Sequence, residues 1–177
     1  MANVDRYDEI CAAFRWDVPE RFNIGQACCA RWASDRTRFA MYWEDEDGAR
    51  AAYTFFDLAQ HANRLSNALA ARGIGRGDKV ALLLPQRPET AIAHVAVYQM
   101  GAIAVPLSFL FGPDALEYRL ADSGASVAIV DPQTAANLEG ARAQLPSLAH
   151  VIGAAGARGP RYLAWDEVLA RASRRFE

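Results

Sequence analysis

Helix-like and strand-like spacings of apolar residues follow one another along the middle of the chain. The segment TFFDLAQHANRLSNALAARG, which starts at Thr54, has a single apolar stripe made by Leu58, Ala62, Leu65 and Leu69. This spacing predicts an amphipathic helix with one face against a core. Thr54 and Asp57 have the arrangement of a capping box, so we expect the helix to begin there.

Glycines end this helix and lead into a strand. Gly73 stands where helices commonly end in the left-handed conformation, and VALLL (Val80–Leu84) is a continuous apolar run typical of a strand buried on both faces. Closely spaced glycines with a lysine also occur in phosphate loops, but such a loop leaves a strand and enters a helix. Here the order is reversed, and Lys79, the only lysine, begins the strand. We therefore interpret RGIGRGDKV as a helix end and a turn.

The next elements repeat the alternation of strand and helix. Pro88 suits the first turn of a helix that runs to about Met100, Gly101 ends it, and Ala102–Leu107 predicts a second buried strand. A loop (SFLFGP), a helix (DALEYRLADSG) and a third strand (Ser126–Asp131) follow. A weaker strand near HVIGAA and a last helix around AWDEVLARASRR complete the pattern. The fold class predicted is α/β, an open and mainly parallel sheet flanked by helices.

Two further elements are expected before this core. Phe39–Trp43 and Ala51–Phe55 alternate on either side of the acidic turn EDEDGAR, which predicts a β-hairpin. The spacing of the carboxylates lacks the ligand pattern of a calcium loop, so the turn is interpreted as solvated. Phe22–Ala33 predicts an amphipathic helix against the rest.

Composition and charge limit the possible functions. The 177 residues are 52% hydrophobic with a net charge of −2, enough for one domain and without an electrostatic reason to bind nucleic acid. The sequence shows no apolar run of membrane-spanning length and a charged amino terminus, so a cytoplasmic location is expected. We interpret Cys11, Cys28 and Cys29 as small buried side chains rather than metal ligands or disulfides. The three histidines, which we interpret as surface or packing residues, are His61, His94 and His150.

The sequence contains no nucleophile elbow, no glycine fingerprint between strand and helix, and no cluster of metal-ligating residues. Open parallel sheets bind ligands beyond the carboxyl ends of their strands. The loops expected there are PQRPE after Leu84, SFLFGP after Pro106 and DPQT after Val130.

An ordered set of motifs over Tyr53–Asp131 resembles the amino-terminal region of AMP-forming acyl-CoA synthetases, of the adenylate-forming superfamily. The set comprises Y-T-F, N-R-L-S-N-A-L, G-D-K-V-A-L-L-L-P, the P-E helix start, G-A-I-A-V-P-L and Y-R-L-A-D-S-G-A. The upstream F-N-I and R-W-A most resemble the acetyl-CoA and medium-chain acyl-CoA synthetase branch. The resemblance implies one α/β subdomain over 1–177, made of a helix and hairpin (22–55), a βαβ core (54–131) and a trailing strand and helix (132–177).

The resemblance also implies a two-step ligase that uses ATP, CoA and Mg²⁺. A carboxylate attacks the ATP α-phosphate to give an acyl-adenylate and pyrophosphate, and the CoA thiol then displaces AMP. The family's phosphate loop, its later Glu motif, its ribose-binding Asp and its carboxy-terminal lysine are not in this sequence. We therefore expect this chain alone to be inactive and to bind no cofactor tightly, its partners being the remainder of a synthetase chain and a carboxylic acid substrate.

The site residues implied by the resemblance lie in the loop after the second strand. Ser108, Phe109, Leu110 and Phe111 would lie on the CoA side, with Leu110 where medium-chain relatives have a polar residue that touches CoA. Packing against another subdomain is the alternative role of this loop. A second hypothesis is that the chain is a freestanding binding or interaction module. A partial synthetase would expose an apolar face and self-associate, whereas a module would be a monomer or a defined dimer.

Overall fold

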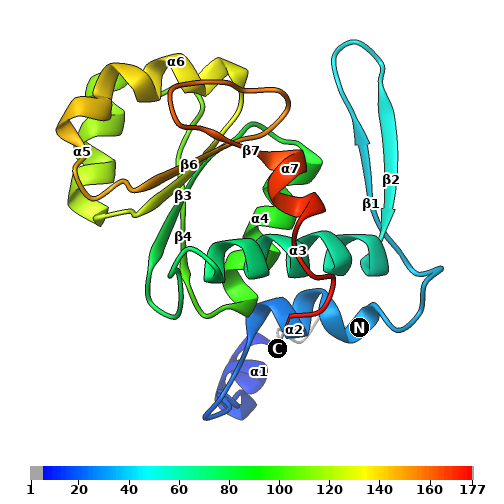
Figure 1. Cartoon of the computed structure of the whole chain (residues 1–177). Coiled ribbons are helices and arrows are strands. Elements are labelled where there is room, and N and C mark those ends of the chain that lie inside the picture. Colours follow the sequence, from blue (N-terminus) through cyan, green and yellow to red (C-terminus); the bar gives the residue numbers. More distant parts are fainter. Residues whose placement is uncertain (1–5, 177) are drawn as a thin grey trace.

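A five-stranded parallel sheet is the centre of the structure (Figure 1). The computed structural model describes residues 6–176. In sequence order the strands are β3 (Lys79–Leu83), β4 (Ile103–Pro106), β5 (Val127–Val130), β6 (His150–Gly153) and β7 (Leu163–Ala164). They lie in the order β4-β3-β5-β6-β7, and every neighbouring pair is parallel. The α/β fold expected from the sequence is confirmed.

Helices cover both faces of this sheet (Figure 1). One face packs against α3 (Phe55–Ala70), α4 (Pro88–Gln99) and α7 (Trp165–Ala170). The other packs against α5 (Pro113–Ser123) and α6 (Pro132–Ala141), which a short 3₁₀ turn, η2 (Arg142–Gln144), follows. The sheet is therefore the middle layer of three.

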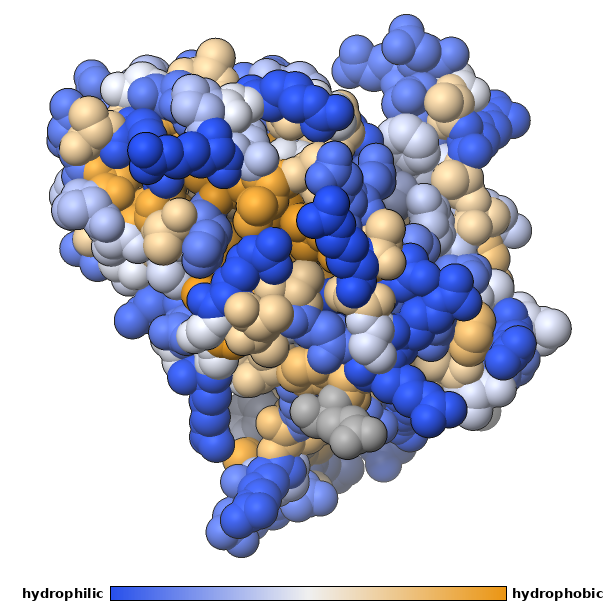
Figure 2. Space-filling model, in the orientation of Figure 1, coloured by the Kyte–Doolittle hydropathy of each residue, from blue (hydrophilic) through white to orange (hydrophobic). Residues whose placement is uncertain are grey.

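The predicted hairpin is present and stands apart from the main sheet. Its strands, β1 (Phe39–Glu44) and β2 (Arg50–Thr54), pair with each other in an antiparallel sheet of their own. Figure 1 shows the hairpin projecting from the start of α3, and Figure 2 shows mainly hydrophilic side chains at its far end. The acidic turn is thus exposed to solvent, as expected.

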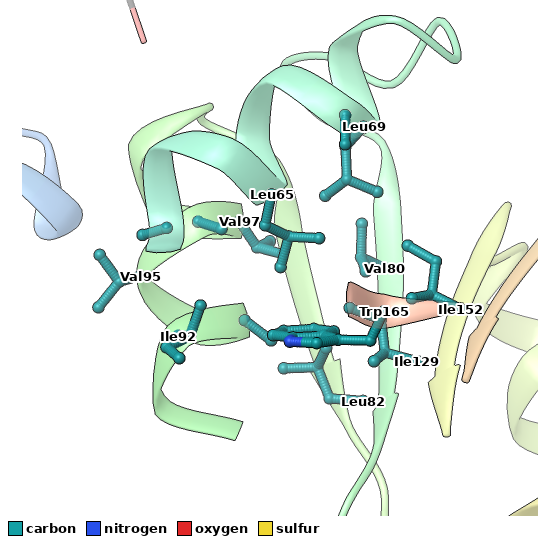
Figure 3. Packing of buried hydrophobic residues seen from close by; sticks show 14 of the residues in the cluster. Leu65, Leu69, Val80, Leu82, Ile92, Val95, Val97, Ile129, Ile152 and Trp165 are labelled. Carbon is teal, nitrogen blue, oxygen red and sulfur yellow. The ribbon is translucent and has the colours of Figure 1, made fainter. Parts of the chain in front are cut away.

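Alternate side chains of the central strands β3 and β5 point to opposite faces of the sheet and so belong to two different hydrophobic cores. Val80 and Leu82 of β3 belong to the cluster under α3, α4 and α7, whereas Ala81 and Leu83 belong to the cluster under α5 and α6. The indole of Trp165 lies in the first cluster, among side chains that include Leu65, Leu82 and Ile129 (Figure 3). Burial on both faces explains why β3 reads as a continuous apolar run.

The start and end of α3 follow the sequence closely. The Thr54 hydroxyl accepts from the Asp57 amide at 3.1 Å, and the Asp57 carboxylate accepts from the Thr54 amide at 2.9 Å, which completes the capping box. The stripe of Leu58, Ala62, Leu65 and Leu69 is buried. Gly73 has φ 80°, and the Gly75 amide donates to the Asp78 carboxylate at 2.7 Å. The glycine-rich stretch is therefore a helix end and a turn, as predicted.

The amino-terminal helix is shorter than predicted. In place of one helix over Phe22–Ala33, the structure has α2 (Ile24–Cys28) and a 3₁₀ turn, η1 (Ala30–Trp32). The helix breaks at Cys29, whose φ and ψ of −131° and −65° are outside the helical region. Before it lies α1 (Tyr7–Ala13), which the sequence analysis did not predict and which has no buried residue.

Three other expectations need correction, and one strand was missed. Strand β4 was expected to be buried, but it is an edge strand, and Ile103 is 47% exposed. The supposed loop DPQT is the start of α6, because Asp131 is its N-cap and Pro132 its first residue. The last helix ends at Ala170, so the final five residues of the predicted segment, 171–175, lie outside it. Strand β7 was not predicted at all.

The cysteines also differ from expectation. Only Cys29 is buried, while Cys11 and Cys28 are exposed, and all three thiols are free. Burial, and to a smaller extent the neighbouring Cys28, raises the pKa of the Cys29 thiol to about 11. Within residues 6–176 no helix is long and apolar enough to span a membrane, and no group of His, Cys, Asp and Glu side chains could hold a metal ion.

The close contact between α2 and α4 gives a first prediction. A Cβ atom built on Gly25 would lie 2.8 Å from both the backbone nitrogen and the Cβ of Gln99. The backbone of α4 cannot move away without disturbing the core, so we expect Gly25→Ala to lower the free energy of unfolding by about 1–3 kcal/mol in urea titrations.

Gly75→Ala is the matched control. Nothing lies within 4 Å of a Cβ at Gly75, which adopts no left-handed φ. It should change stability by less than about 0.5 kcal/mol. Equal effects of the two substitutions would contradict the close packing of α2 on α4.

Candidate functional site

The carboxyl ends of β4, β3 and β5 meet at one edge of the sheet. Because these strands are parallel neighbours, the segments after Leu83, Pro106 and Val130 lie side by side. A cleft of about 330 Å³ opens at this edge between the first turns of α4 and the loop that follows β4. Its lining is formed by Leu82, Leu84, Pro85, Gln86, Thr90, His94, Pro106, Leu107, Ser108 and Phe109. This is the position at which an open parallel sheet binds a ligand.

The four candidate residues of the loop divide into two pairs. Ser108 and Phe109 line the cleft, but Leu110 is 76% exposed and is not among its lining residues. Phe111 packs against the core under α5 and α6, with the Arg119 guanidinium 4.2 Å from its ring centroid. The structure therefore brings only the first two into the cleft.

Hydrogen bonds fix the shape of this loop. The Leu110 amide donates to the Ser108 hydroxyl at 3.2 Å, and the Phe111 amide donates to the Ser108 carbonyl at 3.2 Å. The Asn137 side-chain amide donates to the Phe111 carbonyl at 3.1 Å, which ties the loop to α6. The loop is thus a formed turn, and the Ser108 hydroxyl is used inside it.

Polar groups of α4 form the opposite wall. The Thr90 hydroxyl donates to the Pro85 carbonyl at 2.6 Å, and the Nδ1 atom of His94 lies 2.9 Å from the Thr90 carbonyl. This contact orients the imidazole ring, and since a carbonyl only accepts, Nδ1 carries the proton. Thr90 was not singled out from the sequence, and His94 was interpreted there as a surface or packing residue, whereas the structure places it in the cleft lining. The spacing of Thr90 and His94, one helical turn apart after a proline, could have indicated a shared face.

The loop after β3 is joined to the hairpin by an ion pair and a tryptophan. Arg87 donates to both carboxylate oxygens of Glu89, at 2.7 and 3.3 Å, and their side chains are only 23% and 18% exposed. The Trp43 indole N–H donates to the Gln86 carbonyl at 3.1 Å, and the Arg87 guanidinium lies 6.0 Å from the Trp43 ring centroid. The part of the hairpin next to its turn is therefore fixed to the edge of the sheet.

The same ion pair affects the titration of nearby groups. The hydrogen bond to Glu89 raises the pKa of Arg87, so the guanidinium stays charged. Burial, and then the negative charge of Glu89, raises the pKa of Tyr53. This wall of the edge therefore presents a neutral phenol and a neutralised ion pair.

Buried hydrogen bonds of Thr134, just after β5, join the end of β3 to the start of α6. The Thr134 hydroxyl donates to the Leu83 carbonyl at 2.8 Å, and its amide donates to the Asp131 carboxylate at 2.9 Å. Both residues are buried. They satisfy backbone groups at the ends of β3 and α6, which is a structural role that leaves no open loop after β5.

A second cleft, of about 410 Å³, lies between α3, β7 and α7. It is away from the carboxyl edge, and its polar groups have partners: the Asn67 side-chain amide donates to the Ser173 and Arg175 carbonyls, and Arg171 lies 3.9 Å from Glu167. We therefore take the cleft beside Ser108 as the candidate site.

A parallel α/β sheet with its cleft at the carboxyl edge defines a broad class, and sequence comparison narrows it. Residues 27–174 match the family model described as AMP-binding enzyme. The chain therefore belongs to the AMP-binding enzyme family.

Curated proteins with similar sequences are named coenzyme A synthetases. A 3-hydroxypropionyl-coenzyme A synthetase of Sulfurisphaera tokodaii is 35% identical over 117 residues, which are 65% of this chain and 18% of that protein. An acetyl-coenzyme A synthetase of Gemmatimonas aurantiaca is 39% identical over 94 residues, 53% of this chain and 14% of that protein. The chain thus corresponds to less than one fifth of the length of these relatives.

Solved structures agree in fold. An acyl-CoA synthetase of Brucella canis superposes with a TM-score of 0.83 at 30% identity, over 98% of this chain and 33% of that one. The anthranilate CoA ligase AuaEII, solved in complex with anthranoyl-AMP, gives a TM-score of 0.82 at 26% identity, over 91% of this chain and 30% of that one. The predicted likeness to the amino-terminal segment of acyl-CoA synthetases is confirmed.

The ion pair beside the cleft gives a second prediction. Glu89→Gln would leave the Arg87 guanidinium half-buried without its charged partner, so we expect the free energy of unfolding to fall by about 1–3 kcal/mol. Urea titrations of both chains followed by circular dichroism measure this difference.

The exposed pair between Arg50 and Glu44 provides the control. Its side chains are 74% and 54% exposed, so Glu44→Gln should cost less than about 1 kcal/mol. A larger effect at Glu44 than at Glu89 would show that the buried pair does not hold the hairpin.

Proposed function

We propose that this chain is the amino-terminal scaffold of an ATP-dependent, AMP-forming acyl-CoA synthetase. The intact enzyme would convert a carboxylic acid, ATP and CoA into acyl-CoA, AMP and pyrophosphate, with Mg²⁺ on the phosphates. The observation that supports this is the superposition of nearly the whole chain on one third of a solved acyl-CoA synthetase. The chain would act as one subdomain over 1–177, with ATP and acyl binding residues supplied by other parts of the enzyme.

The exposed apolar residues support a role inside a larger assembly. The amino-terminal arm, residues 7–24, exposes Tyr7, Ile10, Phe14, Trp16, Val18, Phe22 and Ile24. Ile103 on the edge strand and Leu110 in the loop are exposed as well. Exposed apolar surface of this extent is typical of an interface, here with the remainder of the synthetase.

The first test is enzymatic. We predict that the purified chain gives no acid-dependent exchange between ATP and pyrophosphate, because within residues 6–176 no cluster of side chains could hold a metal ion and the sequence has no strand-to-helix phosphate loop. Exchange that depends on a carboxylic acid would contradict the scaffold role.

The loop after β4 is proposed as a CoA-side contact. We predict weak binding, detected as saturation transfer from the chain to CoA protons in NMR, because the loop supplies only one wall. Phe109→Ala should remove at least about half of the transfer, whereas Tyr118→Ala, an exposed aromatic on α5, should leave it unchanged. Transfer that survives Phe109→Ala would exclude this role.

Reading the gene beyond the codon for Glu177 separates the scaffold from a freestanding binding module. An open frame that soon encodes a Ser/Thr/Gly-rich loop ending in Gly-Lys would support the scaffold. A stop codon would favour the module. Light scattering adds an independent measure, since a module is expected to be a monomer or defined dimer and a scaffold to associate through apolar surface.

A further inference from the structure

Charge is unevenly distributed on this molecule, although its net charge is only −2. Four consecutive carboxylates, the acidic tip, occupy the end of the hairpin: Glu44, Asp45, Glu46 and Asp47. Six arginines, the basic strip, lie on α3 or in segments that contact it or the tryptophan beside it: Arg31, Arg36, Arg38, Arg64, Arg174 and Arg175. The two features have opposite charge and lie at opposite ends of the hairpin.

Contacts with α3 place the arginines of the strip together. Arg31 and Arg38 stack on Trp32, at 4.5 and 3.9 Å from its ring centroid, and Trp32 contacts Phe55 at the start of α3. The Arg36 guanidinium lies 4.5 Å from the ring centroid of Phe56. These three arginines therefore surround the first turn of the helix.

The other half of the strip is the C-terminal segment that crosses the helix. Asn63 donates to the Arg174 carbonyl at 2.9 Å, and Asn67 donates to the Arg175 carbonyl at 2.7 Å. Phe56, Asn63 and Asn67 are seven and four residues apart, so they share one face of α3. In Figure 1 the C-terminal segment passes across α3, and Figure 2 shows hydrophilic side chains interspersed with apolar ones in this part of the surface.

The charges of the strip are not neutralised within residues 6–176. None of the six guanidinium groups has an ion pair with a described residue. The nearby Asp35 and Asp57 carboxylates hydrogen-bond to Thr37 and Thr54 and offset only part of the positive charge. Burial, together with the charges of Arg64 and Arg174, lowers the pKa of His61, which is therefore neutral at physiological pH. Stacking on aromatic rings leaves the N–H edges of the Arg31, Arg36 and Arg38 guanidinium groups available for carboxylates.

The tip cannot reach the strip of its own molecule. Strand β2 has five residues and spans roughly 16 Å at about 3.3 Å per residue, paired along its length with β1. At physiological salt the Debye length is only about 8 Å. Glu44 pairs with Arg50 and Asp45 holds the turn, which leaves Glu46 and Asp47 directed to solvent without an ion pair among the described residues.

We propose that the acidic tip of one copy of this chain docks on the basic strip of a second copy. Arginine and carboxylate groups would then pair between molecules, several at once, which makes the contact stronger than isolated surface ion pairs. The contact is electrostatic and separate from the apolar arm.

Sedimentation equilibrium at two salt concentrations tests the proposal. We expect a higher weight-average mass at about 0.01 M salt, where the Debye length is roughly 30 Å, than at about 1 M, where it is roughly 3 Å and only apolar association remains. Association through apolar surface would persist or strengthen with salt. A monomer at both concentrations, or association that grows with salt, would overturn the proposal.

Charge reversal identifies the two surfaces. The tip variant Glu46→Lys/Asp47→Lys and the strip variant Arg36→Glu/Arg175→Glu should each lose the extra mass seen at low salt, since each sets like charges against each other. All four side chains are exposed. Mixing the two variants should restore association, because in the mixture each tip meets a strip of opposite charge.

A matched variant controls for net charge. Asp17→Lys/Asp122→Lys makes the same change in charge as the tip variant at exposed positions outside both surfaces, and it should associate like the unmodified chain. Failure of the mixture to associate, or loss of association in the control, would show that these two surfaces do not meet. The measurement needs no catalysis, so its failure leaves the proposed function untouched.

Discussion

Burial of β3 and β5 on both faces is the constraint on which the rest of the structure depends. Each of these strands sends alternate side chains to opposite sides, so one short run of apolar residues builds two cores. Backbone groups of buried strands must pair with neighbouring strands, which requires β4 on one side and β6 on the other. Because all these connections are parallel, the chain must return through a helix each time. The loops that line the cleft, after β3 and β4, are where two of these returns begin.

Elements with a regular pattern and clear end signals were predictable. The α3 helix has both, since a stripe of leucines follows a capping box and leads to a glycine with φ 80°. The central strands were recognisable because no other element of this length is apolar at consecutive positions. The hairpin followed from alternation around an acidic turn.

What the sequence did not show depends on tertiary contacts. Strand β4 is as apolar as β3, yet it lies at the edge, since strand order is not encoded in the composition of single strands. The start of helix α6 was not predicted because Asp131-Pro132 also suits a turn. Only the hydrogen bond from the Thr134 amide to the Asp131 carboxylate shows that Asp131 is a helix N-cap. In the candidate site, the loop was found from its place after a strand, but the turn that directs Leu110 outward and Phe111 inward arises from bonds to Ser108 and Asn137.

Cys29 is buried, whereas the other two thiols are exposed, so the reactivity of Cys29 can report local unfolding around it. Cys11 and Cys28 are exposed, so alkylating reagents can reach them in the folded chain. Cys29 is buried, and its thiol stays protonated at neutral pH, whereas these reagents attack thiolates. It lies where α2 gives way to η1 and packs in the same core cluster as α3 and α4. The rate at which the Cys29 sulfur is alkylated would therefore report how often α2 and η1 detach from α3 and α4, without any label being introduced.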